Sequence, residues 1–225
     1  MTRNNVRNSP MTQKRYRATQ PYGGIDARER KAARRETFVE AGLEAFGTIG
    51  YARSTIADIC KEAGLTQRYF YESFKDKEAL LVAVYRKLIG DIEEDARIIF
   101  DQPDISLDDK GRKMLQTFYQ RFKDNPRRAQ VQLFEVLGVS PLVDSEYRAG
   151  MIKLSDWCKI IANTIFPEFP SPHGEQTVIF TGMAGAIIQI AHQWVLDGMK
   201  MEVEEIVDQI SNMLFTLGKY YTDRF

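Results

Sequence analysis

The segment that decides the fold spans residues 54–74 and reads STIADICKEAGLTQRYFYESF. Its apolar residues recur at helical spacing on both sides of a central glycine, which predicts two short helices joined by a sharp turn. We expect Ser54 to cap a helix over 55–62 and Thr66 to cap a helix over about 67–74. This spacing is typical of a helix-turn-helix, which places its second helix in the major groove of DNA.

The polar residues of the expected second helix suit contact with a duplex. Arg68 can donate two hydrogen bonds to guanine and Gln67 can pair with adenine, while Tyr69 offers a ring to a thymine methyl group. Four further residues could bond phosphates and fix the register of the protein on DNA. They are Thr55, Tyr71, Lys75 and Lys77. The alternative is an ordinary helical hairpin whose polar residues are simply solvated.

The rest of the chain also has helical periodicity, and we find no convincing period-two strand, so we predict an all-α protein. Asp76 is expected to cap one helix and Pro126 to occupy the first position of another. The helices expected outside the central segment cover 27–47, 77–100, 107–124, 126–138, 142–166, 175–198 and 202–222.

Composition and charge narrow the class of protein. The chain has 225 residues, 44% of them apolar, and only two cysteines and two histidines. A disulfide scaffold and a four-cysteine zinc site are therefore excluded, and we expect neither a metal nor a cofactor. The net charge is zero, but residues 1–90 sum to +7 and residues 91–225 to −7. This split indicates that the N-terminal part meets a polyanion.

Two segments bear on the location of the protein. Residues 1–25 hold basic residues and no acidic one, which predicts a disordered basic tail, or alternatively an arm that lies on DNA phosphates. They lack the apolar run of a secretory signal, so we expect a cytoplasmic protein. Residues 176–196 carry no charge and could span a bilayer by length, but their polar residues, such as His192, favour a buried helix of a soluble protein without membrane contact.

In addition to the helix-turn-helix spacing of 54–74, residues 36–82 resemble the DNA-binding domain of the TetR family of bacterial transcriptional regulators. The motifs that carry the resemblance are Ala41-Gly-Leu-Glu-Ala-Phe46, Gly50-Tyr51, Thr55, Ile56, Ile59-Cys60, Ala63-Gly-Leu-Thr66, Phe70-Tyr71, Phe74 and Lys77-Glu-Ala-Leu80. The sequence departs from the family at three positions. Arg68 stands where the family often has a small residue, Tyr69 where it has Thr or Ser, and Ser73 where it has His or Tyr.

The resemblance implies a helix-turn-helix DNA-binding domain over 26–76 and a helical effector-binding and dimerisation domain over 77–225. It places Thr55, Tyr71 and Lys77 at phosphates. It also places four residues at or near base edges, namely Thr66, Gln67, Arg68 and Tyr69. The first two departures fall on this reading face, so they are expected to alter which bases are preferred.

The resemblance further implies a homodimer formed by the last two helices, at about 175–198 and 202–222. The final helix carries an apolar seam at coiled-coil spacing. The seam consists of Val203, Ile206, Val207, Ile210, Met213, Leu214 and Leu217. The alternative is that both helices are buried inside one protomer.

An effector pocket is implied in the C-terminal domain, and aromatic residues are the candidates for its lining. They are Phe118, Phe122, Phe134 and Trp157, with Tyr119 and Tyr147 on the same helices. Burial in an ordinary core is the alternative for each of them. His192 is interpreted as a hydrogen-bonded interior histidine and Cys60 as a packing residue.

Together these features predict a homodimeric, ligand-responsive transcriptional regulator and not an enzyme. We expect a repressor that a small hydrophobic or aromatic effector releases from a palindromic DNA operator. The alternatives are a helical enzyme that binds a small molecule, and an adaptor that binds only protein. We find no Gly-rich phosphate loop, metal-ligand cluster or nucleophile elbow that would favour an enzyme.

Two substitutions test the predicted division of roles on DNA. Arg68→Ala should relax base preference at one operator position and cost about 1–3 kcal/mol of binding free energy. Lys77→Ala should weaken binding to all sequences alike and reduce the slope of log affinity against log salt by about one. Titrations of specific and random duplexes at several salt concentrations measure both effects. Equal effects of the two variants on specific and random DNA would refute the division.

Overall fold

The computed structural model describes residues 26–166 and 175–224, and the regular structure within these ranges is entirely helical, as predicted. The elements are α1 (Ala27–Thr48), α2 (Ile56–Ala63), α3 (Gln67–Ser73), α4 (Lys77–Phe100), α5 (Leu107–Asp124), α6 (Pro126–Gln130), the π-helix η1 (Val131–Glu135), α7 (Pro141–Ile165), α8 (Glu175–Leu196) and α9 (Val203–Arg224). The predicted tail over 1–25 and the loop over 167–174 lie outside the described residues.

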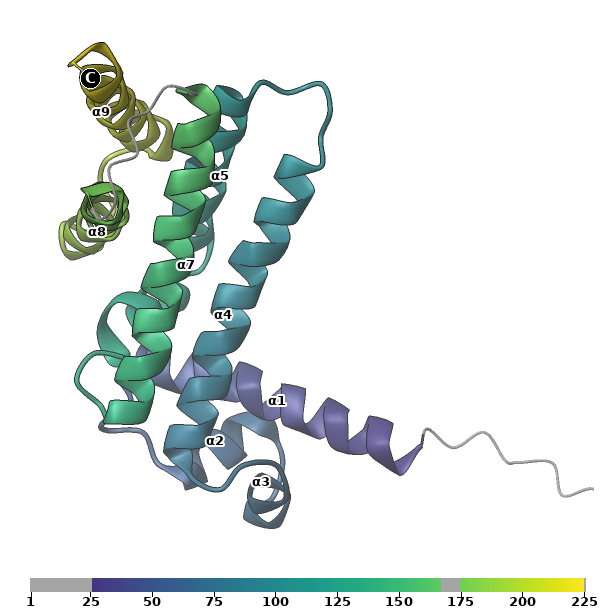
Figure 1. Ribbon diagram of the computed structural model, residues 1–225. Helices are drawn as coiled ribbons and strands as arrows, with labels where there is room; N and C mark the ends of the chain where they lie inside the picture. The colour runs from purple at the N-terminus through teal and green to yellow at the C-terminus, as the bar shows by residue number, and fades with distance from the viewer. Residues whose placement is uncertain (1–25, 167–174, 225) are drawn as a thin grey trace, which may run out of the picture.

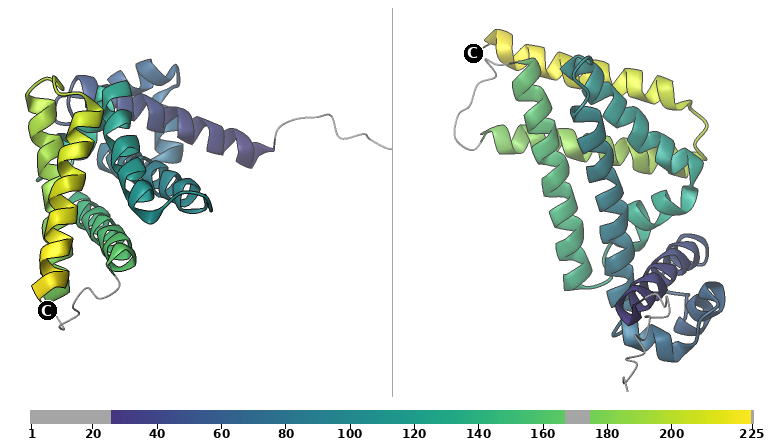
Figure 2. Two further views of the ribbon diagram at one scale, coloured as in Figure 1. Left: turned by 90° about the horizontal axis from the view of Figure 1, so that it is seen from above. Right: turned by 90° about the vertical axis from the view of Figure 1, so that its right-hand side faces the viewer.

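The helices form two groups that share α4 (Figure 1). Helices α1, α2 and α3 gather at one end of the molecule. From there α4 runs alongside α5 and α7, and α8 and α9 lie across one side of these three helices (Figure 2). The long helix α4 therefore links the helix-turn-helix to the C-terminal helices.

The start of α2 differs from the prediction by one residue. Thr55, not Ser54, is the N-cap: its hydroxyl accepts a hydrogen bond from the Asp58 amide, and the Asp58 carboxylate accepts one from the Thr55 amide. This reciprocal capping box satisfies two backbone donors at once, which a cap at Ser54 would not do. Ser54 is instead buried, and its hydroxyl donates to the Gly50 carbonyl at 2.7 Å.

The prediction of a single α-helix over 126–138 was wrong for the second half of this range. Pro126 occupies the first turn of α6, as predicted, and Asn125 caps this helix. After Gln130, however, the backbone continues as the π-helix η1. A π-helix inserts an extra residue into a turn, and such turns are frequent at functional sites.

The core of the helix-turn-helix is built on aromatic rings. Phe38 of α1 packs edge-on against Phe70 of α3 at 5.4 Å and against Phe74 at 6.5 Å between ring centroids. Leu80 and Leu81, from the first turns of α4, are fully buried in the same cluster. The first turns of α4 thus complete the core of the N-terminal helices, although the predicted domain boundary falls between residues 76 and 77.

The first half of the apolar seam of α9 faces inward, contrary to the prediction, whereas Met213 in its second half is 41% exposed. Val203, Ile206, Val207 and Ile210 are each only 1–2% exposed within the single protomer. They belong to a cluster that includes Tyr119 and Phe122 of α5. This face of α9 is therefore used inside the protomer, and any second copy must pack on the opposite face.

Helix α8 is the one element among the described residues that is long and apolar enough to cross a membrane by length and composition, over Val178–Leu196. One third of this stretch is buried inside the protomer, including Ala184, Ala191 and Trp194. The expectation of a buried helix thus holds for one face of α8. The other face is exposed.

Helix α6 lies unusually close to α1. A Cβ atom placed on Gly47 would come within 2.4 Å of the Arg127 Cβ and 2.8 Å of its Cα. Such distances are far inside van der Waals contact, so only glycine permits this approach. The approach fixes the end of α1 against the C-terminal helices.

Gly47→Ala should therefore destabilise the protein by about 1–3 kcal/mol, because the added methyl group forces the two helices apart. Gly90→Ala is the matched control, since a Cβ atom at Gly90 meets nothing within 4 Å. In a helix interior this control should stabilise by about 0.5–1 kcal/mol. Urea unfolding of both variants measures the difference. A Gly47→Ala variant as stable as the wild type would show that the approach is not tight.

Candidate DNA-binding surface and effector cavity

Helix α3 is anchored by one buried residue and presents its remaining side chains to solvent. Phe70 is fully buried, whereas the Arg68 side chain is 85% exposed and Tyr71 is 59% exposed. Thr66 and Gln67 are also exposed. Thr66 is the N-cap by position, as predicted, but its side chain makes no capping hydrogen bond. The residues predicted to read bases thus lie together on an accessible surface.

Two residues outside the predicted set, Arg34 and Glu72, hold this surface in place. The guanidinium of Arg34, on α1, lies 4.5 Å from the centre of the Tyr69 ring and forms a 3.9 Å ion pair with Glu72. Glu72 also accepts a hydrogen bond from the Arg68 side chain at 3.1 Å. The i,i+4 spacing of Arg68 and Glu72 was a signal for this pair in the sequence. Arg34 could be placed only once the packing of α1 was known.

Lys77 has partners inside the protein. Its Nζ donates to the Tyr51 carbonyl at 2.5 Å and to the Ser54 carbonyl at 2.8 Å, and it lies 4.3 Å from the centre of the Tyr51 ring. Partial desolvation lowers the pKa of Lys77 from its usual value. Lys77 therefore stabilises the turn before α2. Lys77→Ala should lower stability as well as DNA affinity, so the exposed Lys75 is the cleaner residue for testing a phosphate contact.

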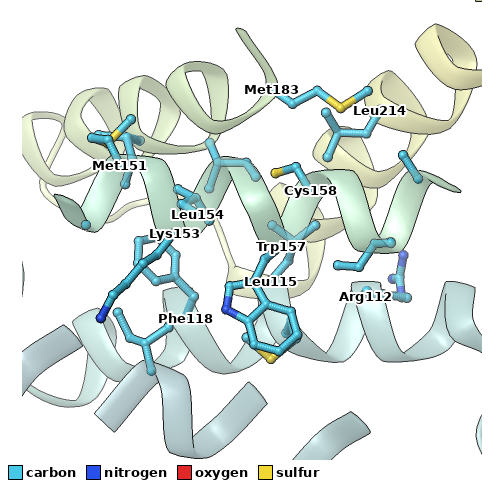
Figure 3. Close-up of a pocket in the computed structure, with 18 of the residues that line it drawn as sticks. Arg112, Leu115, Phe118, Met151, Lys153, Leu154, Trp157, Cys158, Met183 and Leu214 are labelled. Carbon is cyan, nitrogen blue, oxygen red and sulfur yellow. The ribbon is translucent and has the colours of Figure 1, made fainter. Parts of the chain in front are cut away.

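A cavity of about 180 Å³ lies among α4, α5 and α7, with α8 and α9 closing one side (Figure 3). Four of the six predicted aromatic candidates line it, namely Phe118, Phe122, Tyr147 and Trp157. Figure 3 shows Trp157 and Phe118 on its wall together with Leu115, Leu154 and Met151. The wall is almost wholly apolar, which suits a hydrophobic ligand.

Two aromatic candidates are not on this wall. Phe134 instead stacks on His192, with ring centroids 4.2 Å apart. Tyr119 is fully buried, and its hydroxyl donates to the Ile187 carbonyl at 2.8 Å. The prediction that Phe134 lines the cavity was wrong, because its ring packs on His192 of α8 instead.

His192 and the two cysteines, Cys60 and Cys158, lie in the protein interior or on the cavity wall. A ring nitrogen of His192 is hydrogen-bonded to the Leu133 carbonyl at 2.9 Å, which confirms the interpretation of an interior histidine. Cys60 is buried in the N-terminal core, as expected for a packing residue. Burial raises the pKa of the cavity-lining Cys158 to about 12, so this thiol is protonated at neutral pH.

One short segment connects the cavity to the N-terminal helices. In η1, Gln132 and Leu133 line the cavity, while Glu135 accepts a hydrogen bond from the Tyr51 amide at 2.6 Å. Just before it, Arg127 forms a 2.7 Å ion pair with Glu44 of α1. A ligand that moves η1 would therefore act directly on the end of α1 and on the turn that precedes α2.

Comparison with known proteins agrees with this arrangement. The family "Bacterial regulatory proteins, tetR family" matches residues 38–84. The HTH-type transcriptional regulator BetI of Rhizobium meliloti is 35% identical over 63 residues, which cover 28% of this chain and 31% of that protein. The uncharacterised HTH-type regulator YerO of Bacillus subtilis is 35% identical over 69 residues, or 28% of this chain and 24% of YerO. The chain thus matches about a third or less of the length of these relatives.

Solved structures extend the likeness to the whole fold. The regulator FadR of Bacillus subtilis, determined in complex with stearoyl-CoA, has a TM-score of 0.70 at 17% identity and covers 80% of this chain and 96% of its own. A transcriptional regulator from Pseudomonas aeruginosa PAO1 has a TM-score of 0.72 at 13% identity, over 89% and 96% of the two chains. The helix-turn-helix segment over 38–84 thus matches the tetR family of bacterial regulatory proteins in sequence, and the chain as a whole shares the fold of solved bacterial transcriptional regulators.

Proposed function

We propose that the protein is a homodimeric, cytoplasmic transcriptional repressor that binds a palindromic DNA operator and is released by a small, largely apolar effector. The observation that carries this proposal is the exposed face of α3, where Gln67, Arg68 and Tyr69 project from a helix fixed by the buried Phe70. A short helix held rigidly with its polar first turn exposed fits the major groove. Lys75 and Tyr71 are proposed to contact phosphates beside it.

The cavity supports the effector part of the proposal. Its apolar wall matches a hydrophobic molecule, and the structurally similar FadR was determined with stearoyl-CoA, which has a long apolar chain. An effector releases DNA only if it prefers the conformation that does not bind DNA. A typical coupling free energy is about 1–3 kcal/mol. The hydrogen bond from the Tyr51 amide to Glu135 gives this coupling a short physical route.

The dimer is proposed to form through the outward faces of α8 and α9, not through the seam that α9 buries. Gly182 and Gly185 of α8 are open, since a Cβ atom on either meets nothing within 4 Å. Small residues on an exposed helix face let a second backbone approach closely. Apolar residues near the ends of the two helices are also exposed, among them Val178 at 73% and Tyr220 at 51%.

Gly185→Arg should convert the dimer to a monomer, because the long charged side chain would occupy the space that the second copy needs. Gln116→Arg, at an exposed position on α5, is the control for the added charge. Light scattering of the purified variants gives the molar mass, and circular dichroism checks the fold. A Gly185→Arg variant that remains dimeric at micromolar concentration would exclude this face of α8 as the interface.

Selection of a random duplex library on the purified protein, at about 0.15 M salt, tests the DNA-binding function. We expect enrichment of a palindrome whose half-sites lie about one helical turn apart, roughly 34–36 Å. Arg68→Ala should retain the palindrome but lose one base preference in each half-site. A folded protein that enriches no sequence, with or without an apolar effector, would contradict the proposal. Equal effector affinity for free and operator-bound protein would contradict the release mechanism alone.

A further inference from the structure

The cavity wall contains two buried polar side chains that have no hydrogen-bond partner in the described part of the chain. Gln132 is 6% exposed and Tyr85 is 4% exposed, and both line the cavity. Within the described residues neither side chain has a hydrogen-bond partner. Among the described residues, Arg128 Nε is a polar side-chain atom that is fully enclosed by protein and has no partner. The polar atoms of Gln132 and Tyr85 are not enclosed in this way. The Gln132 amide and the Tyr85 hydroxyl therefore open into the cavity.

These two groups lie on elements close to the N-terminal helices. Tyr85 belongs to the early turns of α4, and Gln132 lies in η1, three residues before Glu135. Gly150 of α7 makes room for the tyrosine, because a Cβ atom at that position would come within 2.6 Å of the Tyr85 oxygen. The wall that α4 and η1 contribute thus carries two neutral polar side chains beside apolar residues, and this part of the wall is termed the polar end of the cavity.

The charged residues of the cavity wall are at its edges and are mostly paired. Lys153 is half exposed and lies 2.6 Å from Glu93, and the exposed Arg112 is paired with Asp208. Figure 3 shows Lys153 and Arg112 on opposite sides of the cavity, with Trp157 and Leu115 between them. Among the described residues that line the cavity, no cation is therefore left unpaired for a carboxylate or phosphate buried at the polar end. Such burial is costly, whereas a neutral group needs only hydrogen bonds.

We propose that the effector has an apolar body and one uncharged hydrogen-bonding group, a hydroxyl, carbonyl or amide, which binds Gln132 and Tyr85. This inference rests on the proposed function only in taking the occupant of the cavity to be the effector. An amide both donates and accepts, as does a phenol, so the pair can hold any of these three groups. Because Gln132 shares η1 with Glu135, binding at this end acts on the segment that contacts the turn before α2.

Calorimetric titration of the full-length protein with three probes of equal chain length tests the proposal. The probes are 1-octanol, octanoate and octyltrimethylammonium. We expect 1-octanol to bind at least tenfold more tightly than either ion. Tyr85→Phe and Gln132→Leu should each weaken 1-octanol binding about tenfold, the equivalent of one hydrogen bond of about 1.4 kcal/mol. Octanoate binding as tightly as 1-octanol, no heat from any probe, or unchanged 1-octanol affinity in both variants would overturn the proposal.

Tyr119→Phe is the matched control, since it removes another buried hydroxyl that bonds to Ile187 and lies off the cavity wall. It should leave 1-octanol affinity unchanged. Without any ligand, it should lower Tm, while Tyr85→Phe and Gln132→Leu should keep or raise Tm because they remove unpaired polar groups. A lower Tm for both cavity variants would mean that these groups are paired inside the protein, contrary to the proposal. None of these readouts requires DNA, so failure of the DNA-binding function would be seen separately, in the duplex selection.

Discussion

The contact between Phe38 and the pair Phe70 and Phe74 is the interaction on which the exposed face of α3 depends. Helix α3 has only seven residues, and a helix this short is not stable by itself in water. Its position therefore comes from Phe70, which is buried in the N-terminal core against Phe38 of α1. With that ring fixed, the side chains on the opposite face of α3 must point to solvent. The direction of Arg68 follows from the burial of its neighbour.

A second constraint joins this surface to the rest of the protein. Helix α4 supplies Leu80 and Leu81 to the N-terminal core and, further along, lines the cavity. The approach of α6 to Gly47 and the hydrogen bond from the Tyr51 amide to Glu135 add a second connection. A ligand in the cavity and a DNA duplex on α3 would thus each favour one packing arrangement of the same helices. Both connections would transmit this preference between the two sites. Packed cores tend to have discrete arrangements, which is what a regulator of this kind requires.

The sequence was most informative where local chemistry decides the structure. The cap at Asp76, the proline that begins α6 and the helical extents of α1 and α4 were all predicted correctly, because each depends on residues within one or two turns. It was less informative about α2, where Ser54 and Thr55 are both good caps. The capping box with Asp58 selects Thr55 as the cap. The sequence spacing permits this pair of hydrogen bonds, but only the backbone geometry shows that they form.

The sequence by itself determined an all-α chain, a helix-turn-helix over 54–74 and the residues that face outward from its second helix, since helical periodicity and caps are local properties. Only the tertiary structure decided how faces are paired. It buried the first half of the apolar seam of α9 inside the protomer, it stacked Phe134 on His192 and off the cavity wall, and it gave Lys77 two carbonyl partners. An apolar stripe shows that a face will be buried, but which surface buries it depends on residues distant in the chain. The neutral polar end of the cavity is a result of the same kind, because Tyr85 and Gln132 are 47 positions apart in the sequence and meet the same space only after α4 and η1 have packed.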